Sequence, residues 1–394
     1  MQHSNTDIVV IGTGLAGYTV ARELRKLSPD AALTLITRDD GSSYSKPQLS
    51  TGFAQRKSAD QLALASVEQM RDQLRATIFN HTTVQSLNAQ AQILTLSKTD
   101  NGATSDPLTL PFAQLVLAVG AHQMRPSLQG DGASAVMTVN DLHDYRDLRN
   151  KVSLSNSAPI ILLGAGLIGC EFANDLAGAG FNVHVVTLGE TALAPLLPSA
   201  FGHSLQTALS KLGVQWHCNT SIQSVVRQAG NYSVTLMDGT SLPAQAVLSA
   251  TGLRPNIELA HAAGLNTQRS VIVDDFMRAS AANIYAIGDC AEREGVVLPY
   301  VLPLMNQARA VAKSLVGTPT RVVYPVMPVV VKTPVLPITF VLPHERPEHW
   351  EIHGDEQGMK CLTYADDGKL IGFALSGSAN SEKTALVKQL SVNG

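Results

Sequence analysis

Two short glycine loops are the residues of this sequence whose types and spacing most clearly point to chemistry. The first follows DIVVI and the second follows PIILL, and both space their glycines as G-x-G-x-x-G. In such a loop the first glycine makes a tight turn, the second lets backbone amides approach a pyrophosphate, and the third lets the next helix pack on the strand. The helix N-terminus then faces the anion. The glycines are Gly12, Gly14 and Gly17 in the first loop and Gly164, Gly166 and Gly169 in the second.

Each loop needs a strand before it and a helix and a second strand after it. Residues 7–11 predict the first strand, apolar residues recur at helical spacing at Val20, Leu24 and Leu27, and ALTLIT predicts the next strand. Around the second loop, IILL predicts a strand, CEFANDLAGAG a helix and VHVVTL the following strand. Two complete βαβ units in one α/β chain predict two dinucleotide sites.

Three further stretches complete an ordered set of motifs. LVLAVGAHQMRP (115–126) and VLSATGLRPN (247–256) each predict a strand, a small-residue turn and a proline, and NIYAIGDCAE (283–292) ends an apolar strand in Gly288 and Asp289. With the two loops, these motifs resemble the family of two-dinucleotide-binding flavoprotein pyridine-nucleotide reductases, over residues 7 to about 320. The resemblance implies that the first loop holds FAD, that the second holds NADH or NADPH, and that the Gly-Asp pair binds the ribityl-phosphate portion of the flavin.

The same resemblance implies a domain organisation like that of glutathione reductase, with two Rossmann-like dinucleotide-binding domains and a small α+β C-terminal domain. Residues 1–118 and 246–320 are expected to form the FAD-binding domain, which the NAD-binding domain at 119–245 interrupts. Residues 321–394 are expected to form a C-terminal interface domain. Two nucleotide folds in one chain could bring nicotinamide onto flavin, since hydride transfer needs reacting atoms about 3–3.5 Å apart.

The absence of cysteine from residues 1–169 narrows the branch of the family. Reductases that pass electrons to a cysteine pair beside the flavin, and oxidases with a single redox cysteine near residues 42–46, are excluded on this ground, so electrons are expected to leave directly from the flavin. YSKPQLSTGF (44–53) resembles the Y-x-R/K-P-x-L-S segment of reductases that serve rubredoxins and the ferredoxins of oxygenase systems. Its Lys-Pro version looks most like the rubredoxin branch. Rubredoxin is therefore the expected partner, with a ferredoxin as the alternative.

Lys46 and Glu171 are candidates for a catalytic pair. In relatives a lysine near the flavin N5 atom pairs with a glutamate at the position of Glu171, although that lysine often aligns with Thr51. Lys46 lies in the loop that the resemblance places beside the flavin. Lys46 or its neighbour is expected to tune flavin reduction; the alternative is that Lys46 is an ordinary exposed lysine.

Lys332 is a second catalytic candidate, because it interrupts the apolar, β-branched stretch PVVVKTPVL. An unpaired buried ammonium is costly, so Lys332 is expected to have a partner such as a flavin carbonyl or a carboxylate. Alternatively, the strand lies at a sheet edge and the charge prevents further pairing.

Residues 302–317 predict a helix that could also serve the flavin. Its N-terminal amides, around Met305 and Asn306, are expected to point at the pyrimidine end and to stabilise negative charge there. The alternative is a packing helix in which Met305 fills the core.

The ribose contacts are expected from acids near the ends of the second strand of each unit. Asp39, about 20 residues after the first loop, is favoured for the adenosine ribose of FAD, next to Arg38. After the second loop, residues 187–190 contain no lysine or arginine, which favours NADH over NADPH, and Glu190 is expected to reach the ribose.

The complete set of expected cofactor contacts combines these residues with the turns around them. For FAD they are Gly12, Gly14, Leu15, Ala16, Gly17, Arg38, Asp39, Lys46, Pro47, Ala118, Val119, Gly120, Arg125, Gly288, Asp289, Met305, Asn306 and Lys332. For NADH they are Gly164, Gly166, Leu167, Ile168, Gly169, Glu171, Glu190, Ala250, Thr251 and Gly252.

Composition excludes other classes of protein. With 29 basic and 32 acidic residues the formal charge is -3, and no basic arm indicates nucleic acid or lipid headgroups. The N-terminal residues are not expected to form a signal peptide, and the proline-rich stretch 324–343, with Lys332 inside it, predicts short buried strands rather than a membrane helix. Four scattered cysteines favour a cytoplasmic protein, and no histidine or cysteine spacing predicts a metal site.

Three alternatives to a rubredoxin reductase remain open from the sequence. A reductase for an oxygenase ferredoxin would differ only in its partner, and an NADH oxidase would consume oxygen without a carrier. A non-enzymatic protein that senses redox state through bound FAD and NADH would turn over slowly with every acceptor. Since rubredoxins are generally acidic, the expected dock is a basic patch to which Lys46, Arg56, Lys57, Arg309 and Lys313 contribute.

Overall fold

The computed structural model describes residues 7–100, 103–104, 106–343, 345, 347, 349–355 and 357–393. The first six residues, where no signal peptide is expected, lie outside this set. The chain divides into two compact units, each built from separate stretches of sequence. Unit 1 comprises Met1–Lys46, Ala63–His122 and Leu253–Tyr324, and unit 2 comprises Pro47–Leu62, Gln123–Gly252 and Pro325–Gly394.

Unit 1 is built on a five-stranded parallel sheet with the strand order β21-β10-β1-β2-β5. Every residue of its central strand is buried, as expected for a parallel sheet covered on both faces. The strands are β1 (Ile8–Ile11), β2 (Leu33–Ile36), β5 (Thr77–Phe79), β10 (Gln114–Leu117) and β21 (Ile284–Ala286).

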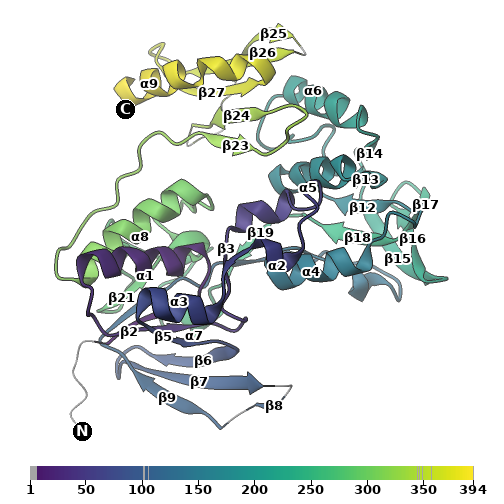
Figure 1. The fold of residues 1–394 in the computed structure, drawn as a ribbon. Coiled ribbons are helices and arrows are strands. Elements are labelled where there is room, and N and C mark those ends of the chain that lie inside the picture. Colours follow the sequence, from purple (N-terminus) through teal and green to yellow (C-terminus); the bar gives the residue numbers. More distant parts are fainter. Residues whose placement is uncertain are drawn as a thin grey trace. The chain divides into compact units, whose positions relative to one another are not determined.

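The described residues of unit 1 form four α-helices, of which α1 and α8 lie side by side (Figure 1). They are α1 (Leu15–Leu27), α3 (Val67–Leu74), α7 (Glu258–Ala262) and α8 (Val301–Leu315). An antiparallel layer of β6 (Thr82–Asn88), β7 (Ile93–Asp100), β8 (Ala103–Thr104) and β9 (Leu108–Pro111) extends the unit. Its shorter strands are β3 (Ser43–Tyr44), β4 (Ala63–Ala65), β19 (Leu253–Pro255), β20 (Val271–Ile272) and β22 (Ala291–Glu292); β11 (Ala121–Gln123) reaches the boundary with unit 2.

Unit 2 repeats the same principle with a four-stranded parallel sheet in the order β14-β13-β12-β18. Its strands are β12 (Ile160–Leu163), β13 (Val183–Val186), β14 (Gln215–His217) and β18 (Ala246–Ser249). The helices are α2 (Ala59–Leu62), α4 (Leu142–Lys151), α5 (Leu167–Gly178) and α6 (Ser199–Ser210). An antiparallel sheet of β15 (Ile222–Gln228), β16 (Asn231–Leu236) and β17 (Ser241–Ala244) shares a hydrophobic core with β12, β13 and β18.

The C-terminal part of unit 2 is an antiparallel sheet of order β23-β24-β27-β26-β25 that α9 covers. The elements are β23 (Val329–Val331), β24 (Ile338–Val341), β25 (Glu351–Asp355), β26 (Gly358–Tyr364), β27 (Leu370–Ser376) and α9 (Lys383–Asn393). Leu386 and Leu390 of the helix are buried with Phe373 and Leu375 of the sheet. The short strands expected within 324–343 are present as β23 and β24; β24 is mostly buried as expected, whereas in β23 only Val331 is buried. Among the described residues, no helix is long and apolar enough to cross a membrane.

The α/β class and both predicted βαβ units are confirmed, with boundaries that shift by a few residues. α5 begins at Leu167, three residues before its predicted start, and α1 begins at Leu15, because each helix starts directly after the second glycine of its loop. Residues 47–62 group with unit 2 by their contacts. The division into an FAD-binding, an NAD-binding and a C-terminal domain stays a prediction.

Candidate functional site

The first glycine loop joins β1 to α1 in the geometry that its spacing predicts. Gly12 has φ +108°, and a Cβ atom there would overlap the carbonyl oxygen of Ala118. A Cβ on Gly17 would overlap the carbonyl oxygen of Gly12, whereas a Cβ on Gly14 would meet nothing within 4 Å. The fold itself therefore requires glycine at positions 12 and 17, whereas Gly14 leaves open space beside the loop.

The second loop, between β12 and α5, has the same arrangement. Gly164 has φ +109° and lies against the carbonyl of Ala250, and a Cβ on Gly169 would overlap the carbonyl oxygen of Gly164. Gly166 again leaves open space within 4 Å.

Both helices start in a way that fits a bound pyrophosphate. The N-cap residues Gly14 and Gly166 are extended and offer no side chain to the first-turn amides. The first turns hold no acidic residue, and their positions are filled by the predicted contacts Leu15, Ala16, Leu167 and Ile168. First-turn N–H groups without a side-chain partner are suited to an anion. The residues present therefore fit one dinucleotide in each unit.

Asp39 is tied to the first loop. Its Oδ1 atom accepts hydrogen bonds from the Thr37 hydroxyl, from the Gly41 amide at 3.0 Å and from the Thr13 hydroxyl at 3.4 Å. Thr13 lies between Gly12 and Gly14, so this network holds an exposed carboxylate beside the loop, as a ribose contact requires. Arg38, the neighbouring predicted contact, is exposed.

The predicted turn Ala118, Val119 and Gly120 follows β10 and is held by Asn256. The Asn256 side chain donates to the carbonyl of Val119 at 2.7 Å, and its amide donates to the carbonyl of Gly120 at 3.0 Å. Sequence reasoning missed Asn256, although it closes the VLSATGLRPN motif.

Gly288 and Asp289 lie in a short 3-10 helix, Gly288–Cys290, directly after β21. The Gly288 amide donates to Oε1 of the buried Gln307 at 2.7 Å, a contact that sequence reasoning missed. Burial raises the pKa of Asp289, and the charge of Lys46 opposes this rise. Lys46 itself is half-buried in a 3-10 helix, Lys46–Ser50, so it is not an ordinary exposed lysine.

Glu292 is a further buried acid of unit 1 that sequence reasoning did not select. It is 1 % exposed, and neither carboxyl oxygen has a hydrogen-bond partner among the described residues. An unpaired buried carboxyl is costly, so a polar group beside it is expected. Its place shortly after Gly288 and Asp289 is compatible with a unit that binds a polar cofactor.

Helix α8 begins at Val301, which changes the expectation for its N-terminal amides. The first-turn positions are Val301 to Leu304, and Pro303 has no N–H to offer. Met305 and Asn306 come one turn later, where amides bond within the helix. The Asn306 side chain donates to the carbonyl of Val323 at 3.3 Å. Any effect of the helix N-terminus on the flavin must therefore come from residues before Met305.

Within unit 2, Lys332 forms an ion pair with Glu171, and Ser50 joins both of them. Nζ of Lys332 donates to Oε2 of Glu171, to Oγ of Ser50 at 2.7 Å and to the carbonyl of Pro47 at 2.6 Å. The Ser50 hydroxyl donates to the same carboxylate at 2.7 Å. We call Ser50, Glu171 and Lys332 the Lys332 cluster. Lys332 thus has the carboxylate partner expected for it, and Glu171 has a lysine partner that comes from the C-terminal part of the chain.

The remaining predicted contacts of the second dinucleotide lie at the ends of β13 and β18. Gly189 donates to the Thr187 hydroxyl at 3.2 Å, and Glu190 is exposed. Thr251 donates to the carbonyl of Met124 at 3.2 Å, and the Met124 amide donates to the carbonyl of Gly252 at 3.0 Å. Arg125, predicted to contact FAD, is exposed and belongs by its contacts to unit 2.

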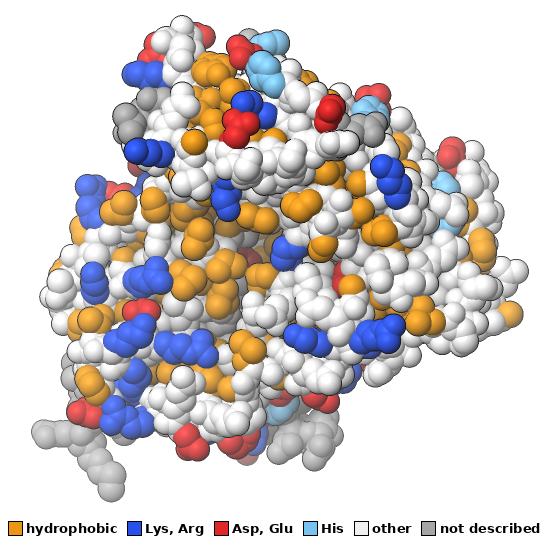
Figure 2. Space-filling model, turned by 45° about the horizontal axis from the view of Figure 1, so that its top comes forward, with side chains coloured by type: hydrophobic (Ala, Val, Ile, Leu, Met, Phe, Trp, Pro, Cys, Tyr) orange, Lys and Arg blue, Asp and Glu red, His pale blue; other side chains and the backbone are white. Residues whose placement is uncertain are grey.

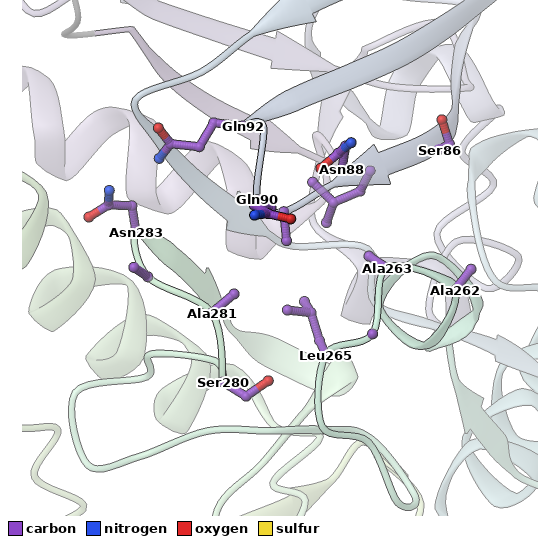
Figure 3. A pocket seen from close by; sticks show the side chains of 14 residues that line it. Ser86, Asn88, Gln90, Gln92, Ala262, Ala263, Leu265, Ser280, Ala281 and Asn283 are labelled. Carbon is purple, nitrogen blue, oxygen red and sulfur yellow. The ribbon is translucent and has the colours of Figure 1, made fainter.

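A separate open groove of about 890 Å³ lies in unit 1 and contains none of the predicted site residues. Figure 3 shows that its walls come from the β6–β7 turn, α7 and the segment before β21. Small side chains and the amides Asn88, Gln90, Gln92 and Asn283 line it, without a charged residue. Such a lining offers no group for the chemistry discussed above.

Comparison with known proteins agrees with this geometry. Residues 6–312 match the family model described as pyridine nucleotide-disulphide oxidoreductase, and residues 321–390 match the rubredoxin binding C-terminal domain. The chain is 42% identical to the rubredoxin-NAD(+) reductase of Acinetobacter baylyi over 385 residues, covering 97% of each protein. It is 35% identical to the nitric oxide reductase FlRd-NAD(+) reductase of Vibrio vulnificus, covering 98% of each.

Solved structures show the same fold. The putidaredoxin reductase in its covalent complex with putidaredoxin superposes with a TM-score of 0.86 at 23% identity, over 99% of this chain and 94% of that one. NADH:rubredoxin oxidoreductase from Clostridium acetobutylicum superposes with a TM-score of 0.78 at 18% identity, over 98% and 94%. The full-length matches in sequence and the two glycine loops together show that the chain belongs to the pyridine nucleotide-disulphide oxidoreductase family.

Proposed function

We propose that this chain is an NADH-dependent FAD oxidoreductase that reduces rubredoxin. One observation carries the proposal: the chain joins two glycine loops of equal geometry to a C-terminal segment, residues 321–390, that matches a rubredoxin binding domain. The relative from Acinetobacter baylyi, similar over its full length, is named for the same reaction.

Bound FAD would supply the ability to take a hydride from NADH and to release the electrons one at a time. The chain itself supplies binding and orientation. In unit 1, Gly12, Gly14 and Gly17 would receive the FAD pyrophosphate, with Asp39 at the ribose and Gly288 and Asp289 at the ribityl-phosphate portion. In unit 2, Gly164, Gly166 and Gly169 would receive the NADH pyrophosphate.

The Lys332 cluster is the catalytic candidate of this proposal. Lys332 would place a positive charge close to the flavin, and Glu171 and Ser50 would fix its ammonium in one position. A carboxylate and a hydroxyl that both bond to one ammonium hold it in a fixed position. This assigns to Lys332 the role that relatives give to the lysine aligned with Thr51.

Rubredoxin as acceptor is consistent with the cysteines of the chain. No cysteine occurs in residues 1–169, and Cys170, Cys290 and Cys361 are buried. Burial raises the pKa of Cys170 to about 12 and that of Cys290 to about 11, so neither is a reactive thiolate. Cys218, the remaining cysteine, is half-buried and has no second thiol near it in the sequence. We therefore infer that electrons pass from the flavin to a protein partner without a thiol relay, and we place the protein in the cytoplasm, where scattered reduced thiols persist.

A basic dock for an acidic partner is part of the proposal. Arg309 and Lys313 are exposed and lie one turn apart on α8, so they share a face of that helix. Figure 2 shows Lys and Arg side chains scattered among hydrophobic ones on the visible surface. Attraction of this kind weakens with salt.

The test compares acceptors side by side. The purified protein is mixed anaerobically with NADH and then with rubredoxin, with a two-iron ferredoxin or with oxygen, at low and high ionic strength. We expect a flavin spectrum, NADH-dependent bleaching, and fastest turnover with rubredoxin that slows as salt rises. Faster turnover with the ferredoxin would make the chain an oxygenase reductase, and rapid oxygen consumption alone would make it an oxidase.

A further inference from the structure

Helix α5 carries two buried polar residues, Asn174 and Asp175, that the proposed chemistry does not use. They are 7 % and 2 % exposed. A buried carboxylate is stable only where hydrogen bonds and charges compensate for lost hydration. Such a residue in the middle of a helix therefore needs a structural or functional reason.

Asp175 holds the segment that carries Ser50. Its Oδ2 atom accepts the amide of Phe53 at 2.9 Å, and its Oδ1 atom accepts the amide of Ala54 at 2.8 Å. Phe53 is three residues after Ser50, whose hydroxyl contacts both other members of the Lys332 cluster. Glu171 and Asp175 are one turn apart on the same face of α5. The helix therefore binds the segment that carries Ser50 at two neighbouring points.

Asn174 holds the segment that carries Lys332 in the same way. Its Oδ1 atom accepts the amide of Val335 at 3.2 Å, three residues after Lys332. The backbone amide of Lys332 itself donates to Oε1 of Glu171 at 3.0 Å. Each of the two segments is therefore bound to α5 both at its cluster residue and three residues farther along.

Aromatic packing around Phe53 also restricts the segment that carries Ser50, in addition to the hydrogen bonds from its amides to Asp175. The Phe53 ring packs edge-on against Tyr145 at 5.3 Å and against Phe181 at 5.8 Å between centroids. Burial raises the pKa of Asp175, while the two amides and the charges of Lys332 and Arg149 oppose this rise. The cations that face Asp175 therefore support its charged form, which is the form that accepts two amide hydrogen bonds.

We propose that Asn174 and Asp175 are positioning residues that fix Lys332 and Ser50 for reaction beside the flavin. Asp175 sets the position of the Ser50 hydroxyl, and Asn174 sets the backbone from which Lys332 extends. Loss of either anchor lets the ammonium of Lys332 leave its place without removing any residue that touches a cofactor. The inference rests on the proposed function, because the position of Lys332 matters to catalysis only if flavin is reduced by NADH.

The test uses the FAD-loaded protein and compares Asp175→Ala with a matched control, Tyr145→Phe. The Tyr145 hydroxyl donates to the carbonyl of Lys57 at 2.8 Å and accepts from Arg149 at 3.2 Å, so the control removes a hydrogen bond from the same segment and keeps Arg149, Asp175 and the three cluster residues themselves. Three quantities are measured: backbone amide exchange in residues 47–57, reactivity of the Lys332 amine toward reductive methylation, and the rate of flavin reduction by NADH with the NADH affinity.

For Asp175→Ala we expect faster amide exchange at residues 53 and 54, a more reactive Lys332 amine, and flavin reduction slowed at least about tenfold with unchanged NADH affinity. Asn174→Ala should also make Lys332 more reactive. Tyr145→Phe should speed exchange near Lys57 and leave the Lys332 amine and the reduction rate unchanged.

Faster exchange in Asp175→Ala together with wild-type Lys332 reactivity and a wild-type reduction rate would overturn the inference. Should Asp175→Ala not fold, Asp175→Asn is judged by the same readouts, since it keeps only one acceptor for two amides. Lys332 reactivity does not depend on turnover, so failure of the proposed function, seen as no NADH-dependent bleaching in the wild type, is distinguishable from failure of this inference.

Discussion

The two glycine loops have almost the same backbone, yet the helices that follow them differ. Gly12 and Gly164 have φ of +108° and +109°, and each lies against the carbonyl of a turn that follows a neighbouring strand. Two residues after the third glycine, however, α1 carries Thr19 and α5 carries Glu171. Thr19 donates to a carbonyl of its own helix at 2.6 Å, whereas Glu171 binds Lys332 and Ser50.

The difference continues along both helices. Five and six residues after the third glycine, α1 carries Arg22 and Glu23, and α5 carries Asn174 and Asp175. Arg22 donates to Ser43 at 3.0 Å, and Glu23 pairs with Lys26 of the same helix at 2.8 Å, both within unit 1. The loops therefore share what dinucleotide binding requires, whereas the helix after the second loop adds the buried residues Glu171, Asn174 and Asp175, which bind the segments that carry Ser50 and Lys332.

The largest expected effect comes from the glycines that both folds require. Gly12→Ala and Gly164→Ala each place a Cβ atom against a backbone carbonyl at positive φ, so each is expected to destabilise its unit by roughly 3 kcal/mol or more. Denaturant unfolding followed by circular dichroism measures this loss. Equal losses of unfolding free energy in the two variants would support the structural equivalence of the loops. A small loss in only one variant would show that the loops are not equivalent.

The glycines over open space should separate the two ligands. Gly14→Ala and Gly166→Ala meet nothing within 4 Å, so both variants should fold. Because the new methyl group enters the space of the pyrophosphate, Gly14→Ala should weaken FAD binding and Gly166→Ala NADH binding, each by about tenfold or 1.4 kcal/mol. Flavin fluorescence and NADH titration measure the two affinities. The reverse pattern would exchange the roles of the units.

Glu171→Thr makes the face of α5 resemble α1. It leaves the partly buried ammonium of Lys332 without its carboxylate, so we expect a loss of about 1–3 kcal/mol in stability together with slower flavin reduction. Urea unfolding and anaerobic stopped-flow reduction measure the two effects. Glu171→Gln keeps the shape of the side chain, so its stability and its rate of flavin reduction should lie between those of Glu171→Thr and the wild type. Wild-type stability and rate in both variants would show that the Lys332 cluster has no part in flavin reduction.

A smaller effect on stability, seen as a pH dependence, is expected from a histidine pair on β13 and β14 of unit 2. His184 on β13 and His217 on β14 bring ring nitrogens within 3.1 Å, where the matching end of β5 carries Phe79. Burial lowers the pKa of both imidazoles, and for His184 the neighbouring His217 adds to this. Because the folded-state pKa lies below the ordinary 6.5, the stabilisation is complete above that pH and is lost as the pH falls through the folded-state value.

His217→Phe copies Phe79 and should flatten the decline in unfolding free energy on acidification below pH 6.5. His203→Gln, a change at an exposed histidine of α6, serves as the control and should keep the wild-type decline. An unchanged decline in His217→Phe would show that the pair does not cause it.

Much of this arrangement could be predicted from the sequence because it depends on local pattern. The glycine spacing and the flanking apolar runs predict both loops and both helices. The apolar residues around Lys332 predict a partner for its ammonium, either a flavin carbonyl or a carboxylate. The identity of that partner could not be predicted, because residues 50, 171 and 332 meet only through tertiary contacts. Asp175 was missed because a single acid in a helix looks solvent-exposed unless the segment packed on it is known.

The start of α8 shows a second limit. The pattern predicted its beginning at residue 302, one residue after the observed start at Val301. With either start Asn306 lies beyond the first turn, and the observed start places Met305 beyond it as well. Helix ends are poorly defined by periodicity when the flanking residues are prolines and aliphatics, as they are in VVLPYVLP. A role inferred for an N-terminal amide depends on that boundary and changes with it.

The most direct measurement of the central claim is an anaerobic titration of the purified protein with NADH, followed by rubredoxin. We expect a yellow protein whose flavin absorbance bleaches fully with one NADH. Two rubredoxin molecules are then reduced and the absorbance returns, with or without prior alkylation of accessible thiols. A colourless protein that cannot be loaded with FAD, a flavin that NADH leaves oxidised, or loss of rubredoxin reduction on thiol alkylation would contradict it.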